Sequence, residues 1–283
     1  MLRLAIQKSG RLSEDSLTLI RECGISFQSS TYKLKTEATN FPLEILFLRD
    51  DDIPGYVRDG VADLGIVGQN VLEEAGCTGL QVEALGFSKC RLALAVPRGE
   101  AYESVQDLRG RSIATSYPQL LGRYLAGHGV QAELHVISGS VEIAPSIGLA
   151  DAVCDIVSSG STLLGNGLRE VETVFRSEAV LIAYAALPPE KQVLLEQLRF
   201  RMQAVRRARR HKYIVLNAPA ASLDAVRALL PGIKAPTVTP LADAGWVSVQ
   251  SVVQEDAFWH ITDQLRAVGA EGILVLPIEK MIE

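Results

Sequence analysis

Short apolar strands, each followed by a polar loop and an amphipathic helix, recur along the first half of the chain, and this rhythm constrains the fold most. Residues 2–6 are apolar and lead through a Gly turn into a helical pattern headed by Ser13. Residues 42–48 and 62–67 begin two further units of the same kind. Strands that alternate with helices form parallel sheets covered by those helices, so we expect an α/β fold. In such sheets, ligands bind at the carboxyl ends of the strands.

A second series of these units begins after residues 90–96, a strongly apolar strand. We therefore expect a boundary between two lobes near residue 96. The apolar strand at residues 179–184 is expected to return the chain to the first lobe, and the two lobes are expected to form a cleft. This organisation assigns residues 1–96 plus about 180–207 to the first lobe and residues 97–179 to the second.

The last third of the chain begins with a charged helical segment, residues 188–212, which we interpret as a solvated amphipathic linker helix. Strands again alternate with helices in the stretch that follows. This stretch is long enough to fold separately, so we expect a third, smaller domain at residues 208–283.

Residues 149–168, LADAVCDIVSSGSTLLGNGL, carry the strongest indication of function. A β-forming segment around Asp155 leads into a loop of hydroxyl-bearing residues and glycine: Ser158, Ser159, Gly160, Ser161 and Thr162. Gly160 lets the backbone approach a ligand closely, and the N–H groups of such a loop at the start of a helix can bind phosphate. Asp155 would repel a phosphate unless it faces sugar hydroxyls or a magnesium ion on the same ligand. The run predicts a sugar-phosphate site, and the alternative is a strand followed by an ordinary Ser/Gly turn.

Charge and cysteine content exclude several classes of protein. The formal net charge is -5, which leaves no basic surplus to neutralise the backbone of a nucleic acid. The four cysteines lack CxxC spacing, which argues against a zinc site and favours reduced thiols. Lys8 and Arg11 come too early for the apolar region of a signal peptide, and no run of 18 apolar residues occurs. We therefore expect a cytoplasmic protein that binds neither nucleic acid nor a membrane.

Eight segments, in order along the whole chain, together form a family pattern: AIQKSGRLSEDSL, LRDDDIPGYVRDGVADLGIVGQNVLEE, CRLALAVP, GRSIATSYPQLL, GSVEIAPSIGLADAVCDIVSSGSTLLGNGLREVE, KYIVLNAP, LLPGIKAPTVTPLAD and GILVLPIEKM. In these segments the chain resembles the long form of ATP phosphoribosyltransferase, the first enzyme of histidine biosynthesis. The resemblance implies a two-lobed α/β catalytic core like that of periplasmic binding proteins, and a C-terminal ferredoxin-like (α+β) regulatory domain. It implies a reaction in which N1 of the adenine of ATP displaces pyrophosphate from C1 of phosphoribosyl pyrophosphate, giving N1-(5-phosphoribosyl)-ATP.

The resemblance also implies roles for individual residues. Asp155 is expected to hold the ribose hydroxyls, and Ser158 to Thr162 the 5-phosphate. Glu142, in GSVEIAP, is a second acidic candidate for the ribose or for its Mg²⁺, and the alternative is that it only caps a helix. Mg²⁺ is the expected cofactor, with Asp155 and Glu142 as its expected protein ligands.

Three cations are expected to face the triphosphate or the pyrophosphate across the cleft, and the alternative is that they are solvated surface residues: Lys8, Arg11 and Arg49. Three adjacent carboxylates, Asp50 to Asp52, follow the last of these. At most two of them are expected to reach the cleft, because Asp52 occupies the position of a helix cap.

Three further residues are ambiguous from the sequence. Asp63 and Asn70 flank the GIVG turn and are expected to hold that loop rather than to take part in catalysis. Tyr117 stacks near the adenine in one interpretation and is a packing residue in the other.

In the tail, the resemblance implies a site for L-histidine as a feedback inhibitor. Thr237 occupies a position that the family uses for this ligand, and Asn217 stands where some members carry an acidic residue that can pair with the amine. The family forms dimers and hexamers, so a homo-oligomer is expected. The alternative for the whole chain is a two-lobed solute-binding protein, since a fold alone does not determine function.

Overall fold

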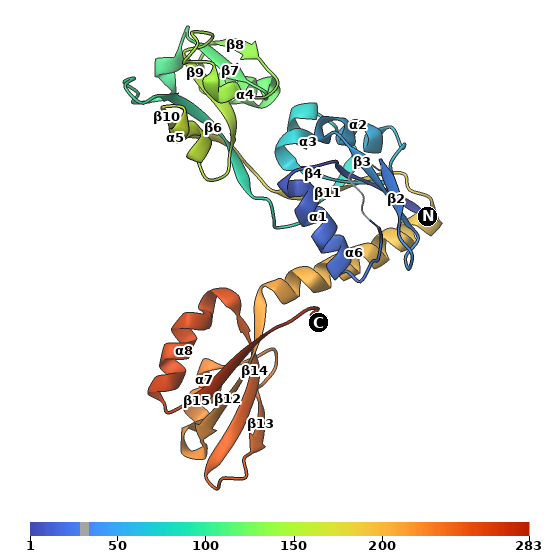
Figure 1. Ribbon diagram of the computed structural model, residues 1–283, viewed down its shortest axis with the longest axis vertical. Helices are drawn as coiled ribbons and strands as arrows, with labels where there is room; N and C mark the ends of the chain where they lie inside the picture. The colour runs from blue at the N-terminus through green and yellow to red at the C-terminus, as the bar shows by residue number, and fades with distance from the viewer. Residues whose placement is uncertain (29–33, 283) are drawn as a thin grey trace. The chain divides into compact units, whose positions relative to one another are not determined.

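The computed structural model describes residues 1–28 and 34–282, and the strands form three separate sheets (Figure 1). The chain divides into two compact units: the first comprises Met1–Thr18 and Ile25–Leu194, and the second comprises Leu19–Gly24 and the chain from Leu195 onward. The first unit contains two of the sheets and the second unit the third. No helix in the described residues is long and apolar enough to cross a membrane.

The first sheet contains six strands in the order β2-β3-β1-β4-β11-β5. Its strands are β1 (Leu2–Gln7), β2 (Lys35–Glu37), β3 (Leu43–Leu48), β4 (Leu64–Gly68), β5 (Leu80–Ala84) and β11 (Ala179–Tyr184), and its helices are α1 (Arg11–Glu22), α2 (Ile53–Arg58) and α3 (Gln69–Ala75). The three strands β3, β1 and β4 run parallel, as the strand–loop–helix pattern predicts. β2 and β11 run antiparallel to their neighbours, so the sheet is mixed rather than wholly parallel.

The parallel strands are buried on both faces, and their sequences show why. Leu4, Ala5 and Ile6 of β1 are consecutive and fully buried, as expected for a strand between two layers of helices. Gly65 in β4 brings helix α2 onto the sheet, because a Cβ atom at this position would lie 2.6 Å from Cγ2 of Ile53. The missing side chain therefore fixes how closely α2 packs.

The second sheet contains five strands in the order β10-β6-β9-β7-β8. Its strands are β6 (Cys90–Pro97), β7 (Ser112–Thr115), β8 (Glu133–Val136), β9 (Ala152–Val157) and β10 (Leu168–Ser177), and its helices are α4 (Pro118–Gly127) and α5 (Ser161–Gly165). The expected boundary near residue 96 does not match this arrangement, because β6 pairs with β9 and β10. The apolar run of β6 is buried on both faces, with Leu92, Leu94 and Val96 in one core cluster and Ala93 and Ala95 in another.

Two neighbouring segments connect the lobes. The chain leaves the first sheet through residues 85–89 and returns through Glu178 alone, so Ser177 and Ala179 belong to different sheets. The N–H of Leu85 donates to the carbonyl of Ala179 (2.9 Å), and the N–H of Ala179 donates to the carbonyl of Phe87 (3.0 Å). Two short hydrogen-bonded crossings of this kind are suited to hinge motion between lobes.

The long helix α6 (Pro189–Arg209) is amphipathic, as the sequence predicts, and starts and ends within the expected range 188–212. It buries one stripe at helical spacing, which includes Leu195, Leu198, Met202 and Val205. The other face carries most of its charged residues. The helix is therefore held by packing and is only partly solvated.

The third sheet forms the tail in the order β13-β14-β12-β15, with all neighbours antiparallel. Its elements are β12 (His211–Pro219), α7 (Leu223–Leu229), β13 (Thr237–Pro240), β14 (Trp246–Gln254), α8 (Phe258–Ala267) and β15 (Glu271–Pro277). This β-α-β-β-α-β sequence with that strand order is the ferredoxin-like arrangement, and it confirms the expected α+β class of the tail. Ile214, Leu216 and Ala218 of β12 are fully buried in its core, whereas alternate residues of the strand lie on the opposite face of the sheet.

Candidate active site

The carboxyl ends of three adjacent parallel strands form the polar edge of the first lobe. Lys8 follows β1 and Arg49 follows β3, and the N–H of Lys8 donates to the carbonyl of Leu48 (2.8 Å). Arg11 begins helix α1, with its Nε atom 3.9 Å from a carboxylate oxygen of Asp15. The predicted cations Lys8, Arg11 and Arg49 are therefore all exposed at one edge of one sheet.

The carboxyl ends of β7, β8 and β9 form a similar edge in the second lobe. These three strands are parallel neighbours, and Thr115 of β7 lies in register with Cys154 of β9. Tyr117 follows β7, and Asp155 lies near the end of β9. Glu142 lies in a short 3-10 helix after β8, η3 (Val141–Ile143). The structure thus brings the predicted acidic residues to the same edge as the hydroxyl loop.

Asp155 is a half-buried carboxyl group. Its Oδ1 atom accepts a hydrogen bond from the N–H of Ile156 (2.8 Å). Burial raises the pKa of Asp155 to about 6, and the negative charge of Glu142 adds to this rise. The two acidic residues predicted for the ribose are thus close enough to interact electrostatically, and a cation between them would relieve their repulsion.

The hydroxyl loop, Ser158 to Thr162, is mostly exposed, and a residue of an ion pair contacts its backbone. The hydroxyls of Ser159 and Ser161 lie 3.0 Å apart, and Gly160 has φ of 84°, in the left-handed region. Arg91 donates to the carbonyl oxygen of Ser158 (3.3 Å) and forms a bidentate ion pair with Glu170 (2.6 and 2.5 Å). Sequence reasoning missed this support, because Arg91 and Glu170 lie in different strands, and their spacing in the sequence does not show that they pair.

Asn70 connects the two lobes beside the site. Its side-chain nitrogen donates to the hydroxyl of Tyr117 in the second lobe (3.0 Å), and its side-chain oxygen accepts from the hydroxyl of Ser177 (2.8 Å). Burial raises the pKa of Tyr117, as do the negative charges of Asp155 and Asp50. Carboxylates of both lobes therefore lie within electrostatic reach of one phenol. The sequence predicts that Asn70 holds the loop at the GIVG turn, whereas these two side-chain hydrogen bonds are made with residues of the opposite lobe.

The three adjacent carboxylates, Asp50 to Asp52, have different surroundings. Burial, together with the neighbouring Asp51 carboxyl, raises the pKa of Asp50 to about 6. The hydrogen bond with Asp50 lowers the pKa of Asp51. Asp52 is the N-cap residue of α2, as the sequence predicts, but its side chain makes no capping hydrogen bond. Asp63 does not lie at this edge. Its carboxylate accepts a hydrogen bond from the N–H of Arg3 (2.8 Å) and forms an ion pair with Lys191 (2.8 Å).

The two residues predicted for histidine lie on the third sheet. Asn217 of β12 is in register with Ser248 of β14, and Thr237 of β13 is in register with Gln250. Both therefore share the face opposite the buried side chains, separated by β14. Gly272 leaves room beside Asn217, since a Cβ atom there would lie 3.4 Å from its side-chain nitrogen.

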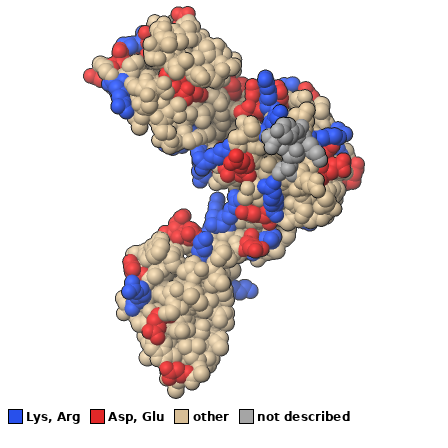
Figure 2. All heavy atoms as spheres, in the orientation of Figure 1, with Lys and Arg blue, Asp and Glu red and all other residues tan. Residues whose placement is uncertain are grey.

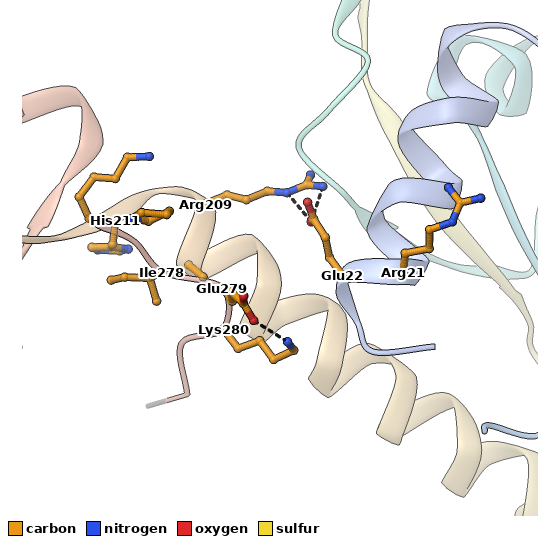
Figure 3. A pocket seen from close by; sticks show the side chains of 10 residues that line it. Arg21, Glu22, Arg209, His211, Ile278, Glu279 and Lys280 are labelled. Carbon is orange, nitrogen blue, oxygen red and sulfur yellow. Dashed lines mark hydrogen bonds and ion pairs between the residues drawn. The ribbon is translucent and has the colours of Figure 1, made fainter. Parts of the chain in front are cut away.

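A separate cavity of about 570 Å³ lies in the second unit and contains none of the predicted site residues. Figure 3 shows Arg209, from the end of α6, directed at Glu22 at the end of α1, and their closest atoms are 2.6 Å apart. Most of the lining side chains are charged or polar: Arg21, Glu22, Arg209, His211, Lys212, Glu279 and Lys280. Basic residues in the last turn of α6 also offset the negative end of that helix.

Solved structures define the class of the two-lobed core. An ATP phosphoribosyl transferase (HisG:HisZ) complex from Thermotoga maritima matches with a TM-score of 0.61 at 30% identity, over 72% of this chain and 99% of that chain. A histidine kinase sensor domain with similarity to periplasmic binding proteins matches with a TM-score of 0.51 over 73% of this chain and 90% of that chain, at 11% identity, which shows the fold alone. The core is thus a two-lobed α/β domain of the periplasmic-binding-protein kind.

The sequence comparisons identify the family. The family pattern described as ATP phosphoribosyltransferase matches residues 49–204, and that of the HisG C-terminal domain matches residues 208–280. ATP phosphoribosyltransferases of Cytophaga hutchinsonii and Parabacteroides distasonis are 59% and 55% identical, over all of this chain and 99% and 100% of theirs. The chain belongs to the ATP phosphoribosyltransferase family, in its long form. It is a pentosyltransferase of the first step of histidine biosynthesis, as the resemblance predicts, and the solute-binding alternative is set aside.

Proposed function

We propose that the edge around Asp155 binds phosphoribosyl pyrophosphate and that ATP attacks it from the side of the first lobe. The observation that supports this most directly is the half-buried Asp155 carboxyl directly before the exposed hydroxyl loop of Ser158 to Thr162. Asp155 holds the ribose hydroxyls, and the loop N–H and hydroxyl groups hold the 5-phosphate. Glu142 is the second acidic group toward the ribose.

The reaction needs alignment and charge stabilisation more than it needs a reactive side chain. N1 of adenine forms a bond to C1 of the ribose while the bond from C1 to pyrophosphate breaks, and pyrophosphate leaves with the electron pair. Negative charge grows on the leaving group and positive charge on the sugar, so cations and a fixed geometry lower the barrier. Lys8, Arg11 and Arg49 supply the positive charge in this proposal, and Asp155 faces the sugar.

Magnesium fits the donor groups of this site. No group of three or more His, Cys, Asp or Glu residues in the described part of the chain could hold a metal ion by itself. Mg²⁺ is commonly bound by one or two carboxylates together with substrate phosphates, so Asp155 and Glu142 suffice as its protein ligands. When bound, the ion neutralises negative charge on the pyrophosphate.

The tail, residues 208–283, is proposed as a regulatory domain that binds L-histidine at Asn217 and Thr237. Asn217 is half-buried and lies beside Gly272, which has no side chain to cover the amide. The backbone of β13 and the hydroxyl of Thr237 offer further hydrogen-bonding groups. An asparagine can accept from the ligand's amine but provides no opposite charge.

A homo-oligomer, with dimers and hexamers as in the resemblance, is proposed from the surface of the tail. Leu274 and Leu276 of β15 are 62% and 45% exposed and lie in register with Val215 and Tyr213 on the open face of the sheet. Figure 2 shows uncharged side chains over most of the face of the tail that is in view. Apolar surface of this kind favours contact between copies of the chain.

The reaction is proposed to take place in the cytoplasm. All four cysteines are free thiols, and two of them, Cys23 and Cys154, are buried. Thiols that persist without pairing fit a reducing compartment.

An assay with one pair of variants tests the site. With ATP, Mg²⁺ and phosphoribosyl pyrophosphate, Asp155→Asn should reduce kcat/KM for phosphoribosyl pyrophosphate about 100-fold, or about 2.7 kcal/mol. Asp151→Asn makes the same change at the other end of β9, where Asp151 bonds Ser112, and should stay within about threefold of the wild type. An Asp155→Asn enzyme within that threefold range would refute the assigned role.

A further inference from the structure

Helix α4, in the second lobe, begins without a cap of its own. Its N-cap residue, Tyr117, makes no side-chain capping hydrogen bond, and Pro118 has no N–H to donate. The next two N–H groups, of Gln119 and Leu120, are among the orphan donors that every helix leaves at its start. These donors need an acceptor from elsewhere in the molecule.

The acceptor is a carboxylate of the first lobe. Glu74, on helix α3, accepts from the N–H of Gln119 at one oxygen (2.8 Å) and from the N–H of Leu120 at the other (2.9 Å). Both bonds are charge-assisted, and the negative charge lies at the positive end of the helix. A residue 45 positions away in the sequence thus caps α4 across the lobe boundary.

Helix α3 makes further contacts with the same segment. Arg123, one turn into α4, donates to the backbone carbonyl of Glu73 (3.1 Å). At the other end of α3, Asn70 donates to the hydroxyl of Tyr117 (3.0 Å). One short helix of the first lobe therefore holds both Tyr117 and the start of α4.

These contacts depend on how the lobes are arranged. Within the part of the chain that the structure describes, the two short crossings are the covalent connections between the lobes, so a hinge opening would separate α3 from α4 and remove the cap. Conversely, the cap favours the arrangement in which Tyr117 of the second lobe contacts Asn70 and lies within electrostatic reach of Asp50, both of the first lobe. An interaction present in one state alone shifts the population toward that state.

We propose that Glu74 is a positioning residue for phosphoribosyl transfer, which caps α4 across the lobes and so holds Tyr117 against Asn70 of the first lobe. This role rests on the proposed function of the Asp155 edge. Glu74 does not touch the reacting atoms. It raises the fraction of the enzyme in the binding-competent arrangement, and substrates at saturation can drive the same closure without it.

The test compares Glu74→Ala and Glu74→Gln with Glu73→Ala in the full-length enzyme. Glu73 is the matched control, because it lies on α3 beside Glu74 but does not cap α4. Its carboxylate lies 3.6 Å from Arg123 of α4, and exposed ion pairs of this kind contribute little. We expect Glu74→Ala to raise KM for both substrates about tenfold, or about 1.4 kcal/mol, with kcat within about threefold of the wild type. The KM values of Glu74→Gln should lie between those of Glu74→Ala and the wild type, because the amide keeps one acceptor. The KM values of Glu73→Ala should stay within about twofold of the wild type.

The split between KM and kcat separates positioning from simple stabilisation. A cap that only stabilises α4 would lower the unfolding temperature and the active fraction, and hence kcat, and leave KM unchanged. That result, or wild-type kinetics for Glu74→Ala, would overturn the proposal. If Asp155→Asn is also fully active, the failure belongs to the proposed site; if Asp155→Asn is inactive, only the role of Glu74 is lost.

Discussion

At the scale of single residues, Asp155 shows how a group that is proposed to bind substrate can oppose folding. The carboxyl group is half-buried, and the neighbouring Glu142 is also acidic. A carboxyl whose pKa is raised in the folded state binds its proton more tightly there than in the unfolded chain. Its ionisation therefore costs stability above the folded pKa. A sugar or cation bound at this site would offset the loss of stability. This is expected where a group serves function at the expense of stability.

We expect Asp155→Asn to be more stable than the wild type at pH 8, although it should be nearly inactive. Raising the pKa from 3.8 to about 6 corresponds to about 3 kcal/mol when the group is ionised in both states. The advantage should shrink as the pH falls through 6 and vanish below about 4, where the carboxyl is protonated in both states. Thermal unfolding at pH 8, 6 and 4 measures this. A variant less stable than the wild type at pH 8 would contradict it, as would a gain that does not depend on pH.

At the scale of elements, the turn between β9 and α5 depends on Gly160. Its φ of 84° is a conformation that residues with a side chain rarely adopt. Space is available, since a Cβ atom would meet only Cγ1 of Val157, at 3.9 Å. The requirement for glycine is therefore one of backbone conformation, not of packing.

Gly160→Ala should destabilise the enzyme by about 1–2 kcal/mol and weaken phosphoribosyl pyrophosphate binding more than ATP binding. The reason is that relaxing the strain rotates the loop N–H groups away from the 5-phosphate. Gly165→Ala is the control, because Gly165 ends α5 with a negative φ and open space around it, and alanine there should be neutral or slightly stabilising. Unfolding in urea and separate KM values for the two substrates provide the measurement. Equal behaviour of the two variants would argue against a special role for the turn.

The sequence predicts most strands and helices of this fold, because their apolar spacing records which faces are buried. It misses β2, β5 and β13, which are short or largely exposed and so lack that spacing. It also assigns β6 to the first lobe, since periodicity shows that a strand is buried but not which strands it pairs with. Pairing is a property of the folded chain.

The same distinction holds for the candidate site. The Asp155 loop is contiguous in sequence, so its composition alone indicates phosphate chemistry. The bond from Asn70 to Tyr117 joins residues 47 positions apart, and the bond between Asn70 and Ser177 spans 107. No local pattern encodes such contacts, and neither Glu74 nor Arg91 could have been selected without the structure.

At the scale of the whole molecule, inhibition by histidine requires communication between separate units. The tail belongs to one compact unit, and the strand edges that we propose for catalysis belong to the other. Regulation is then a coupling free energy between two sites, and it is reciprocal: whatever histidine does to substrate affinity, substrates do to histidine affinity. Changing histidine affinity in the tail alone should therefore leave uninhibited catalysis unchanged.

Asn217→Asp should lower the histidine concentration for half-inhibition about tenfold, or about 1.4 kcal/mol. The carboxylate would pair with the ammonium group of the ligand, an interaction that the amide of Asn217 cannot provide. Thr237→Val, which removes a hydroxyl at nearly constant volume, should raise that concentration. Without histidine, KM and kcat of both variants should match the wild type, because neither residue belongs to the catalytic lobes. Inhibition that is unchanged in both variants would place the histidine site elsewhere, whereas altered uninhibited kinetics would mean that the tail shapes the catalytic edge even without its ligand.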